Sequence, residues 1–334
     1  MRAKRFVRPH EDERGEFELL PKHQVLLEHL LSHRLLTSDQ IERLTGYSHD
    51  HTLKLLQKLW KHEYVDRVKR AKHSDPFAYA LGTKGAKVLQ EKGLYDGRND
   101  FTDKNRNLTK DFVEHDLLTS EFMTRLALSC QKHNARIIYF PEILAKSPES
   151  TRALPRPYQW QVRVSFDGKS TTFTINPDFQ IFGIHFLALP EGRNRNYFSL
   201  ETDMSTEPVN PSDFTKRSNI FKKLLAYKET DVQRMAKTLY RIKVLRTLFI
   251  VRSRKHLQPD SEARIKNIIE AARHLYYDRK IFLFAADQEL AACDDLLRFG
   301  WRNHKDTTPV YFLPPELIPH HERRVDWHKE TSII

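Results

Sequence analysis

Two short helical segments separated by a glycine turn constrain the fold more than any other feature of this 334-residue sequence. Thr37 and Gln40 form a T-x-x-Q pattern, in which each side chain caps a free backbone N–H at a helix start. Gly46 favours the left-handed conformation that ends helices, and Ser48 is a preferred residue before the next helix. The predicted core stripe of that next helix is Leu53, Leu56, Leu59 and Trp60. Two short helices around such a turn are typical of a helix–turn–helix.

The flanking segments complete a winged form of this motif. Apolar residues recur with a helical period over His23–Leu36, which predicts a helix before the pair. Alternating residues predict strands at Tyr64–Lys69 and Phe77–Leu81, and Lys84–Glu91 predicts a further helix. We therefore expect a winged helix–turn–helix domain over residues 20–95.

Positive charge is concentrated on the third helix and the wing. The chain has a net charge of +12, and the segment from Lys54 to Lys72 holds seven basic residues against two acidic ones. Lys and Arg neutralise phosphates and release counterions, so this pattern predicts binding to double-stranded DNA. The residues expected to face base edges are His49, Asp50, His51, Thr52 and Lys54. Those expected at phosphates are Lys58, Lys61, Arg67, Lys69 and Arg70, with Lys72 in the same basic segment. The alternative is a winged helix used for dimerisation or protein docking.

The use of cysteine, glycine and apolar residues excludes several protein classes. Cys130 and Cys293 are the two cysteines and lie far apart, so we expect neither a disulfide framework nor a cysteine-based zinc site. No GxxxxGK[ST] or GxGxxG motif occurs, which excludes nucleotide-driven motors and dinucleotide oxidoreductases. No apolar run approaches the roughly 20 residues of a membrane helix, and the charged N-terminal segment is unlike a signal peptide. We expect a cytoplasmic protein with no membrane partner.

A polar stretch over residues 93–108 predicts a domain boundary. Beyond it, periodicity predicts helices and strands in an α/β layer arrangement with a mixed sheet, over residues 109–300, followed by an extension over 301–334. Asp167 and Gly168 between two alternating runs predict a hairpin that later strands extend. The predicted elements are a helix at Thr109–Gln131, strands at Ala135–Phe140, Trp160–Phe166, Thr171–Ile175, 177–183 and 197–203, a basic helix at Thr215–Thr230, a strand at Thr247–Val251, a helix at Ser261–Tyr276 and a strand at Ile281–Ala285.

Two acidic residues stand where neighbouring strands end. Asp178 and Glu201 would lie side by side there, and two carboxylates with waters and phosphate oxygens suit Mg²⁺. Mg²⁺ or Mn²⁺ in such a site is what a metal-dependent phosphodiesterase needs. Glu114 or Glu121 on the preceding helix could add a third acidic group. The alternative is a structural, hydrogen-bonded cluster at strand ends.

The order of these features resembles the replication-relaxation family of plasmid and mobile-element proteins. The segments that carry the resemblance are 79–89 at the end of the winged helix, 113–117, Pro177–Asp178, 198–207, and a helix with Lys216, Lys223 and Tyr227. The resemblance implies a winged helix fused to a restriction-endonuclease-like fold, which acts in plasmid replication, DNA relaxation or mobilisation.

In that fold the active site follows the pattern PD…(D/E)xK. Asp178 and Glu201 match its acidic positions, but Asp203 stands where the lysine is expected. Lys216 or Lys223 could replace that lysine, Asp203 could be a further metal ligand, or the domain could have lost cleavage. The resemblance also makes His115 a candidate site residue, although a histidine on a helix is more often packed against backbone.

Two functions remain from the sequence. The missing lysine favours a non-catalytic DNA-binding accessory protein of a plasmid or other mobile element, whose nuclease-like domain is degenerate. The paired Asp178 and Glu201 support the alternative, a Mg²⁺-dependent endonuclease or nickase directed by the winged helix. We expect a homodimer, since two-fold symmetry is common among winged-helix proteins on palindromic sites, and a relaxase or replication protein as a partner.

Overall fold

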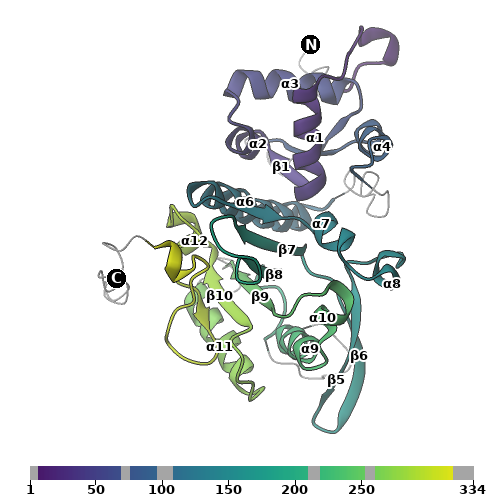
Figure 1. Cartoon of the computed structure of the whole chain (residues 1–334). Helices are drawn as coiled ribbons and strands as arrows, with labels where there is room; N and C mark the ends of the chain where they lie inside the picture. Colours follow the sequence, from purple (N-terminus) through teal and green to yellow (C-terminus); the bar gives the residue numbers. More distant parts are fainter. Residues whose placement is uncertain (1–6, 69–75, 96–107, 210–218, 253–259, 319–334) are drawn as a thin grey trace. The chain divides into compact units, whose positions relative to one another are not determined.

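The computed structural model describes residues 7–68, 76–95, 108–209, 219–252 and 260–318, and these form two compact units (Figure 1). The first unit comprises Met1–Leu128 with Leu154–Arg156, and the second comprises Ser129–Ala153 with Pro157–Ile334. The sequence predicted a boundary near residues 93–108. The contacts instead assign most of the helix that follows, α6 (Lys110–Lys132), to the first unit.

The first unit has the element order of a winged helix. Its elements are α1 (Pro21–His33), β1 (Leu35–Thr37), α2 (Ser38–Thr45), α3 (His49–Lys61), β2 (Val65–Val68), β3 (Ala78–Leu81) and α4 (Thr83–Glu91). The strands form an antiparallel sheet in the order β1-β3-β2. The helix expected to reach Leu36 ends at His33, because Leu35 and Leu36 pair with Ala80 and Tyr79 of β3.

The predicted helix caps are confirmed except at α3. The Thr37 hydroxyl accepts from the Gln40 N–H at 3.3 Å, and the Gln40 side chain accepts from the Thr37 N–H at 2.8 Å. Gly46 ends α2 with a φ of 71°. Ser48 precedes α3, but its side chain makes no capping hydrogen bond. One of the four predicted core residues of α3 was wrong. Leu53 is 37% exposed, and Leu55 is buried instead.

Polar contacts hold the N-terminal part of α6 in the first unit. The Ser120 hydroxyl donates to the carbonyl oxygen of His33 at 2.9 Å. Glu121 accepts from the Arg43 guanidinium at 2.5 and 3.0 Å, and from the Gln40 amide at 3.1 Å. These contacts join α6 to α1 and α2, so the helix expected to open the second domain completes the first unit.

A six-stranded mixed sheet forms the centre of the second unit (Figure 1). Its strand order is β11-β10-β9-β8-β7-β4, in which β8, β9 and β10 are parallel and the other pairs are antiparallel. The strands are β4 (Ala135–Ile138), β7 (Phe179–Phe186), β8 (Arg195–Asp203), β9 (Leu245–Val251), β10 (Phe282–Ala286) and β11 (Arg302–Asn303). The helices are α7 (Phe140–Ala145), α8 (Glu149–Arg152), α9 (Ile220–Val232), α10 (Met235–Tyr240), α11 (Ser261–Arg273) and α12 (Asp287–Ala292).

Two details of the sheet differ from the sequence prediction. The hairpin of β5 (Trp160–Phe166) and β6 (Lys169–Ile175) forms a separate two-stranded sheet rather than extending into β7. It lies against α9, where Trp160 donates to the Thr230 hydroxyl at 2.9 Å. Strand β11 was not predicted, and it draws the start of the expected C-terminal extension into the second unit.

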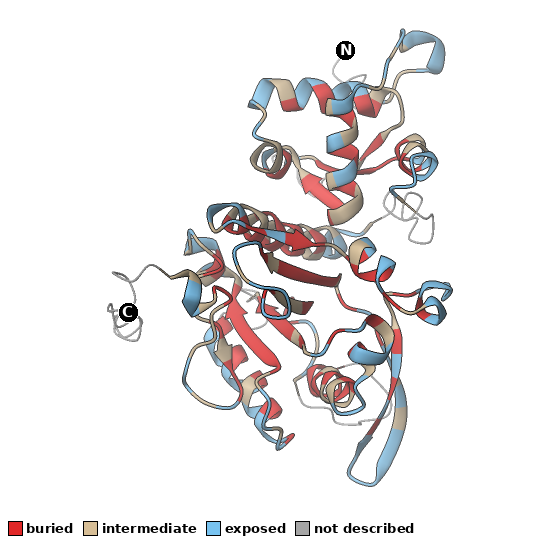
Figure 2. Ribbon diagram, viewed as in Figure 1, coloured by how far each residue is buried: buried red, intermediate tan, exposed pale blue. Residues whose placement is uncertain are grey.

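Side chains alternate between the two faces of β8, so Ser199, Glu201 and Asp203 share one face. Contacts from Tyr227 of α9 and Arg264 of α11 reach this face. The strand is buried along its last six residues, as the red strands in Figure 2 illustrate. Polar groups on this face therefore sit in the interior, where they need partners.

Candidate functional site

Asp178 and Glu201 lie at adjoining ends of neighbouring strands, as the sequence predicted. Glu201 is near the C-terminal end of β8, and Asp178 directly precedes β7. The Asp178 N–H donates to the carbonyl oxygen of Leu200 at 3.0 Å, and its Oδ2 accepts from the Thr202 N–H at 2.7 Å. Backbone hydrogen bonds on both sides of Glu201 thus fix the position of Asp178.

Helix α9 brings a lysine and a tyrosine to the Glu201 carboxylate. Lys223 and Tyr227 are four residues apart, so they lie on one face of the helix. The Lys223 Nζ is 3.2 Å from Glu201 Oε2, and the Tyr227 hydroxyl donates to Glu201 Oε1 at 2.5 Å. The helix begins at Asn219, whose side chain accepts from the Lys222 N–H at 2.8 Å. The capped first turn of α9 therefore fixes where the helix begins, and with it the position of Lys223 relative to the sheet.

Burial and charge act in opposite directions on these groups. Burial raises the pKa of Glu201 to about 7; the Lys223 ammonium opposes this rise, and the nearby Asp178 carboxylate adds to it. Burial acts to lower the pKa of Lys223, but Glu201, Asp178 and Glu207 together raise it above its ordinary value. Lys223 is therefore a cation at neutral pH, and Glu201 gains or loses its proton there.

Asp203 is the carboxylate that stands in the lysine position, and it forms a buried ion pair. Its Oδ2 accepts from Arg264 Nε at 2.5 Å, its Oδ1 accepts from Arg264 Nη2 at 2.9 Å, and both side chains are at most 4% exposed. The Ser205 N–H donates to Oδ1 as well. Arg264 therefore engages both oxygens of Asp203.

Glu207 links this ion pair to Lys223. The Glu207 carbonyl oxygen accepts from Arg264 Nη2 at 2.7 Å. Its carboxylate Oε2 lies 3.3 Å from the Lys223 Nζ, so Lys223 stands between Glu207 and Glu201. Neither Arg264 nor Glu207 was predicted from the sequence as a site residue. Glu207 belongs to segment 198–207 but occupies no position of the PD…(D/E)xK pattern.

The donor set fits a hard divalent cation. Asp178 and Glu201 supply carboxylate oxygens, and Mg²⁺ commonly takes one or two of these together with waters and phosphate oxygens. Among the described residues, no group of three or more His, Cys, Asp or Glu side chains is placed to hold a metal ion. Both Glu201 oxygens have protein donors, and a cation would share or displace one of them.

The other predicted site residues have other surroundings. His115 belongs to the first unit, where its Nδ1 lies 3.2 Å from Asp116 Oδ1. Glu114 and Glu121 pair there with Lys110 and Arg43, respectively. Lys216 lies outside the described residues. Lys223, which the sequence offered as its alternative, is the lysine in contact with Glu201.

The predicted DNA-contacting residues separate into exposed and buried groups. Lys54 and Lys58 are exposed one turn apart on α3, and Lys61 is half-buried on the next turn. Thr52 is wholly buried, so its prediction as a base contact was wrong. Exposed His49 pairs through Nδ1 with Glu42 at 3.0 Å, and half-buried His51 contacts the Tyr47 ring.

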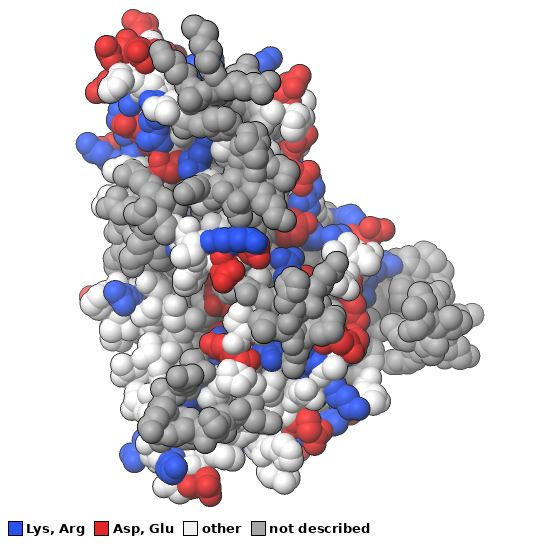
Figure 3. Space-filling view, turned by 180° about the vertical axis from the view of Figure 1, so that it is seen from behind, with Lys and Arg blue, Asp and Glu red and all other residues white. Residues whose placement is uncertain are grey.

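The wing is described in part. The Arg67 guanidinium stacks over the Trp60 ring at 4.0 Å and also faces Phe77. Lys69, Arg70 and Lys72 lie outside the described residues. On the face of the molecule in Figure 3, blue and red side chains stand beside one another, in keeping with the many ion pairs of the chain. The described lysines of α3 are thus the clearest candidates for contact with a polyanion.

Comparison with known proteins identifies the family. The sequence model of the replication-relaxation family matches residues 27–239, which is more than half of the chain. The chain belongs to the replication-relaxation family. Membership suggests a role in the replication or relaxation of mobile elements. The matched residues include Asp178, Glu201 and the two residues that contact the Glu201 carboxylate, Lys223 and Tyr227.

No curated protein sequence matches this replication-relaxation protein significantly. Two solved mutant structures of Lactococcus lactis ZitR are similar to part of it, each at 18% identity and a TM-score of 0.21. They cover 36% and 37% of this chain and 83% and 84% of their own.

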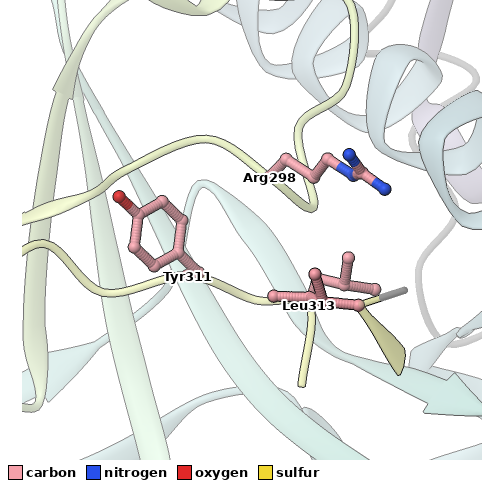
Figure 4. A pocket seen from close by; sticks show the side chains of 4 residues that line it. Arg298, Tyr311 and Leu313 are labelled. Carbon is pink, nitrogen blue, oxygen red and sulfur yellow. The ribbon is translucent and has the colours of Figure 1, made fainter. Parts of the chain in front are cut away.

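A small pocket in the second unit is separate from the Glu201 group (Figure 4). It is lined by Arg298, Tyr311, Leu313 and Ile318, which include no carboxylate. The Arg298 guanidinium and the Tyr311 hydroxyl point in different directions in the close-up. The pocket therefore offers no second set of acidic ligands.

No described helix has the length and apolarity needed to cross a bilayer.

Proposed function

We propose that this replication-relaxation protein binds duplex DNA through its winged helix and breaks a DNA strand at a metal-dependent phosphodiester-cleaving site formed by Asp178, Glu201 and Lys223. The single observation that carries the proposal is the 3.2 Å contact between Lys223 Nζ and Glu201 Oε2. It supplies, from α9, the lysine that the sequence lacks at position 203. Supercoiled DNA relaxes only after at least one strand is broken, so such a site also suits the family to which the chain belongs.

Each residue of the proposed site has a distinct role. Asp178 and Glu201 would hold Mg²⁺ or Mn²⁺, which when bound supplies charge neutralisation at the phosphate and a more acidic water. Lys223 places a fixed positive charge beside them, where negative charge develops as a phosphodiester is attacked. Tyr227 holds one oxygen of Glu201 in place by donating its hydroxyl proton.

One observation supports a second candidate, a DNA-binding accessory protein without cleavage. Both oxygens of Glu201 accept from protein donors, Tyr227 and Lys223, and a direct lysine–carboxylate pair can be the stable end state of a site that no longer binds metal. Under this candidate the winged helix recruits a relaxase or replication protein, as a dimer, to a site on a mobile element. The two candidates differ in whether the second unit binds a divalent cation.

Metal binding distinguishes them. We expect the chain to bind Mn²⁺, detected by isothermal titration calorimetry, and to bind it more tightly as the pH rises from about 6 to about 8. The pKa of Glu201 is raised to about 7, so below that pH its carboxyl must first lose a proton, at a cost of up to about tenfold in affinity per pH unit. Above about pH 8 the affinity should level off.

Asp178→Asn should abolish this binding, whereas Asp231→Asn, another acidic change in the second unit, should preserve it. An absence of Mn²⁺ binding at every pH would favour the accessory candidate.

DNA binding by the winged helix has its own test. We expect Lys54→Ala/Lys58→Ala to weaken binding to duplex DNA and to flatten its dependence on salt by about two units of log K per log salt concentration, since each phosphate contact contributes about 0.9. The matched control is Lys87→Ala/Lys92→Ala, which removes two exposed charges from α4 and the residue after it. Equal salt slopes for the two double variants would exclude α3 as the phosphate-binding face.

A further inference from the structure

We propose that Glu207 is a positioning residue for Lys223. We also propose that Asp203, in the lysine position of the motif, fixes Glu207 through Arg264; we call Asp203 and Arg264 the support of Glu207. This inference rests on the proposed phosphodiesterase function. It adds the residues that hold Lys223, a lysine supplied by α9, beside Glu201.

The support is a continuous series of short contacts. Asp203 takes two hydrogen bonds from Arg264, at 2.5 and 2.9 Å, which orient the guanidinium plane. The same Nη2 atom of Arg264 donates to the Glu207 carbonyl oxygen at 2.7 Å. The backbone at Glu207 is thereby fixed although it lies beyond the end of β8.

Glu207 then acts on the lysine. Its carboxylate is 3.3 Å from Lys223 Nζ, and the Glu201 carboxylate is 3.2 Å from the same nitrogen. A lysine paired with one carboxylate alone can rotate about a long flexible stem, whereas two carboxylates on either side restrict where its ammonium lies. The ammonium is thus kept beside Glu201 and Asp178 rather than free in solvent.

This arrangement accounts for the carboxylate at position 203. Glu201 and Asp203 lie on one face of β8, so a lysine at 203 would reach Glu201 along the strand. When the lysine comes instead from α9, across the sheet face, position 203 is available for a residue that anchors the segment after β8. Asp203 does this through Arg264. The sequence therefore differs from the motif in two linked ways: the lysine comes from α9, and position 203 holds the residue that anchors the segment after β8.

Glu207→Gln in the full chain tests the inference. The amide keeps the shape of the side chain but removes the charge facing Lys223, so we expect kcat for nicking supercoiled DNA with Mn²⁺ to fall about tenfold, through the loss of one ion-pair contact to the lysine. KM for DNA and the thermal unfolding temperature should stay unchanged, since the Glu207 side chain is partly exposed and the α3 lysines are untouched. Glu207→Asp should retain more activity than Glu207→Gln.

The matched control is Glu191→Gln, which removes one exposed negative charge elsewhere in the second unit. If the unmodified chain nicks DNA and Glu207→Gln does so at the same kcat, the inference is wrong and the proposed function stands. If the unmodified chain shows no nicking, the proposed function itself fails. A fall in kcat with a matching fall in unfolding temperature would reduce Glu207 to a structural residue and overturn its positioning role.

Discussion

Lys223→Met is expected to reduce metal-dependent nicking of supercoiled DNA by about a hundredfold to a thousandfold, the usual effect of removing one fixed electrostatic contact to the reacting group. Methionine keeps most of the length and apolar surface of the side chain, so packing around α9 should persist. The charge is lost, however, and nothing replaces the ammonium at 3.2 Å from Glu201. DNA binding, measured by fluorescence anisotropy, should change by less than about twofold, because the α3 lysines are untouched.

Loss of the Lys223 charge also leaves Glu201 buried without its cation, which raises its pKa further and could disturb folding. The double variant Glu201→Gln/Lys223→Met removes both charges and should restore the unfolding temperature without restoring nicking. Lys228→Met, on the same helix, is the matched control and should retain full activity. Undiminished nicking by a folded Lys223→Met protein would show that Lys223 is not the lysine of the site.

Arg264→Met is expected to lower the free energy of unfolding of the second unit by about 3–5 kcal/mol, because removing one partner of a buried pair leaves the other charge uncompensated. Asp203 would then be a buried carboxylate with neither of its Arg264 hydrogen bonds. For a unit of this size the unfolding temperature should fall on the order of 10 °C. Differential scanning calorimetry of the full chain provides the measurement.

A paired substitution separates the charge effect from lost packing. Asp203→Leu/Arg264→Met removes both charges, and apolar replacements of buried pairs are often neutral or stabilising. We expect this double variant to recover most of the lost stability. Lys266→Met, an exposed change on the same helix, should leave the unfolding temperature within about 1–2 °C. A drop for Arg264→Met no larger than for Lys266→Met would contradict the buried ion pair.

Local signals in the sequence were enough to predict the caps of α2 in the first unit. The caps at Thr37, Gln40 and Gly46 depend on residues within four positions of one another, and the structure forms them as predicted. Which face of α3 is buried was harder to predict from the sequence. Leu53 and Leu55 are both apolar, and packing of α3 against α2 and β2 decides which is buried. The same phase buries Thr52, which removed one predicted DNA contact.

Long-range contacts explain what the sequence could not supply about the site. Asp178 and Glu201 were predictable because each lies at or beside an end of a recognisable strand pattern. Arg264 is 61 positions from Asp203, and nothing local to α11 indicates a buried cation there. The contact of Lys223 with Glu201 depends on where α9 begins, which Asn219 and the facing sheet determine. The extent of α6 in the first unit likewise rests on Arg43 and Glu121, 78 positions apart.

Conversion of supercoiled plasmid DNA to the open-circular form, by the full chain with Mg²⁺ or Mn²⁺, tests the central claim most directly. We expect open circles to accumulate with time, to be absent with a chelator, and to be absent with Asp178→Asn at a protein concentration that still shifts the DNA on a gel. Supercoiled DNA that remains intact with either metal, while the protein binds it, would contradict a strand-breaking site at Asp178, Glu201 and Lys223.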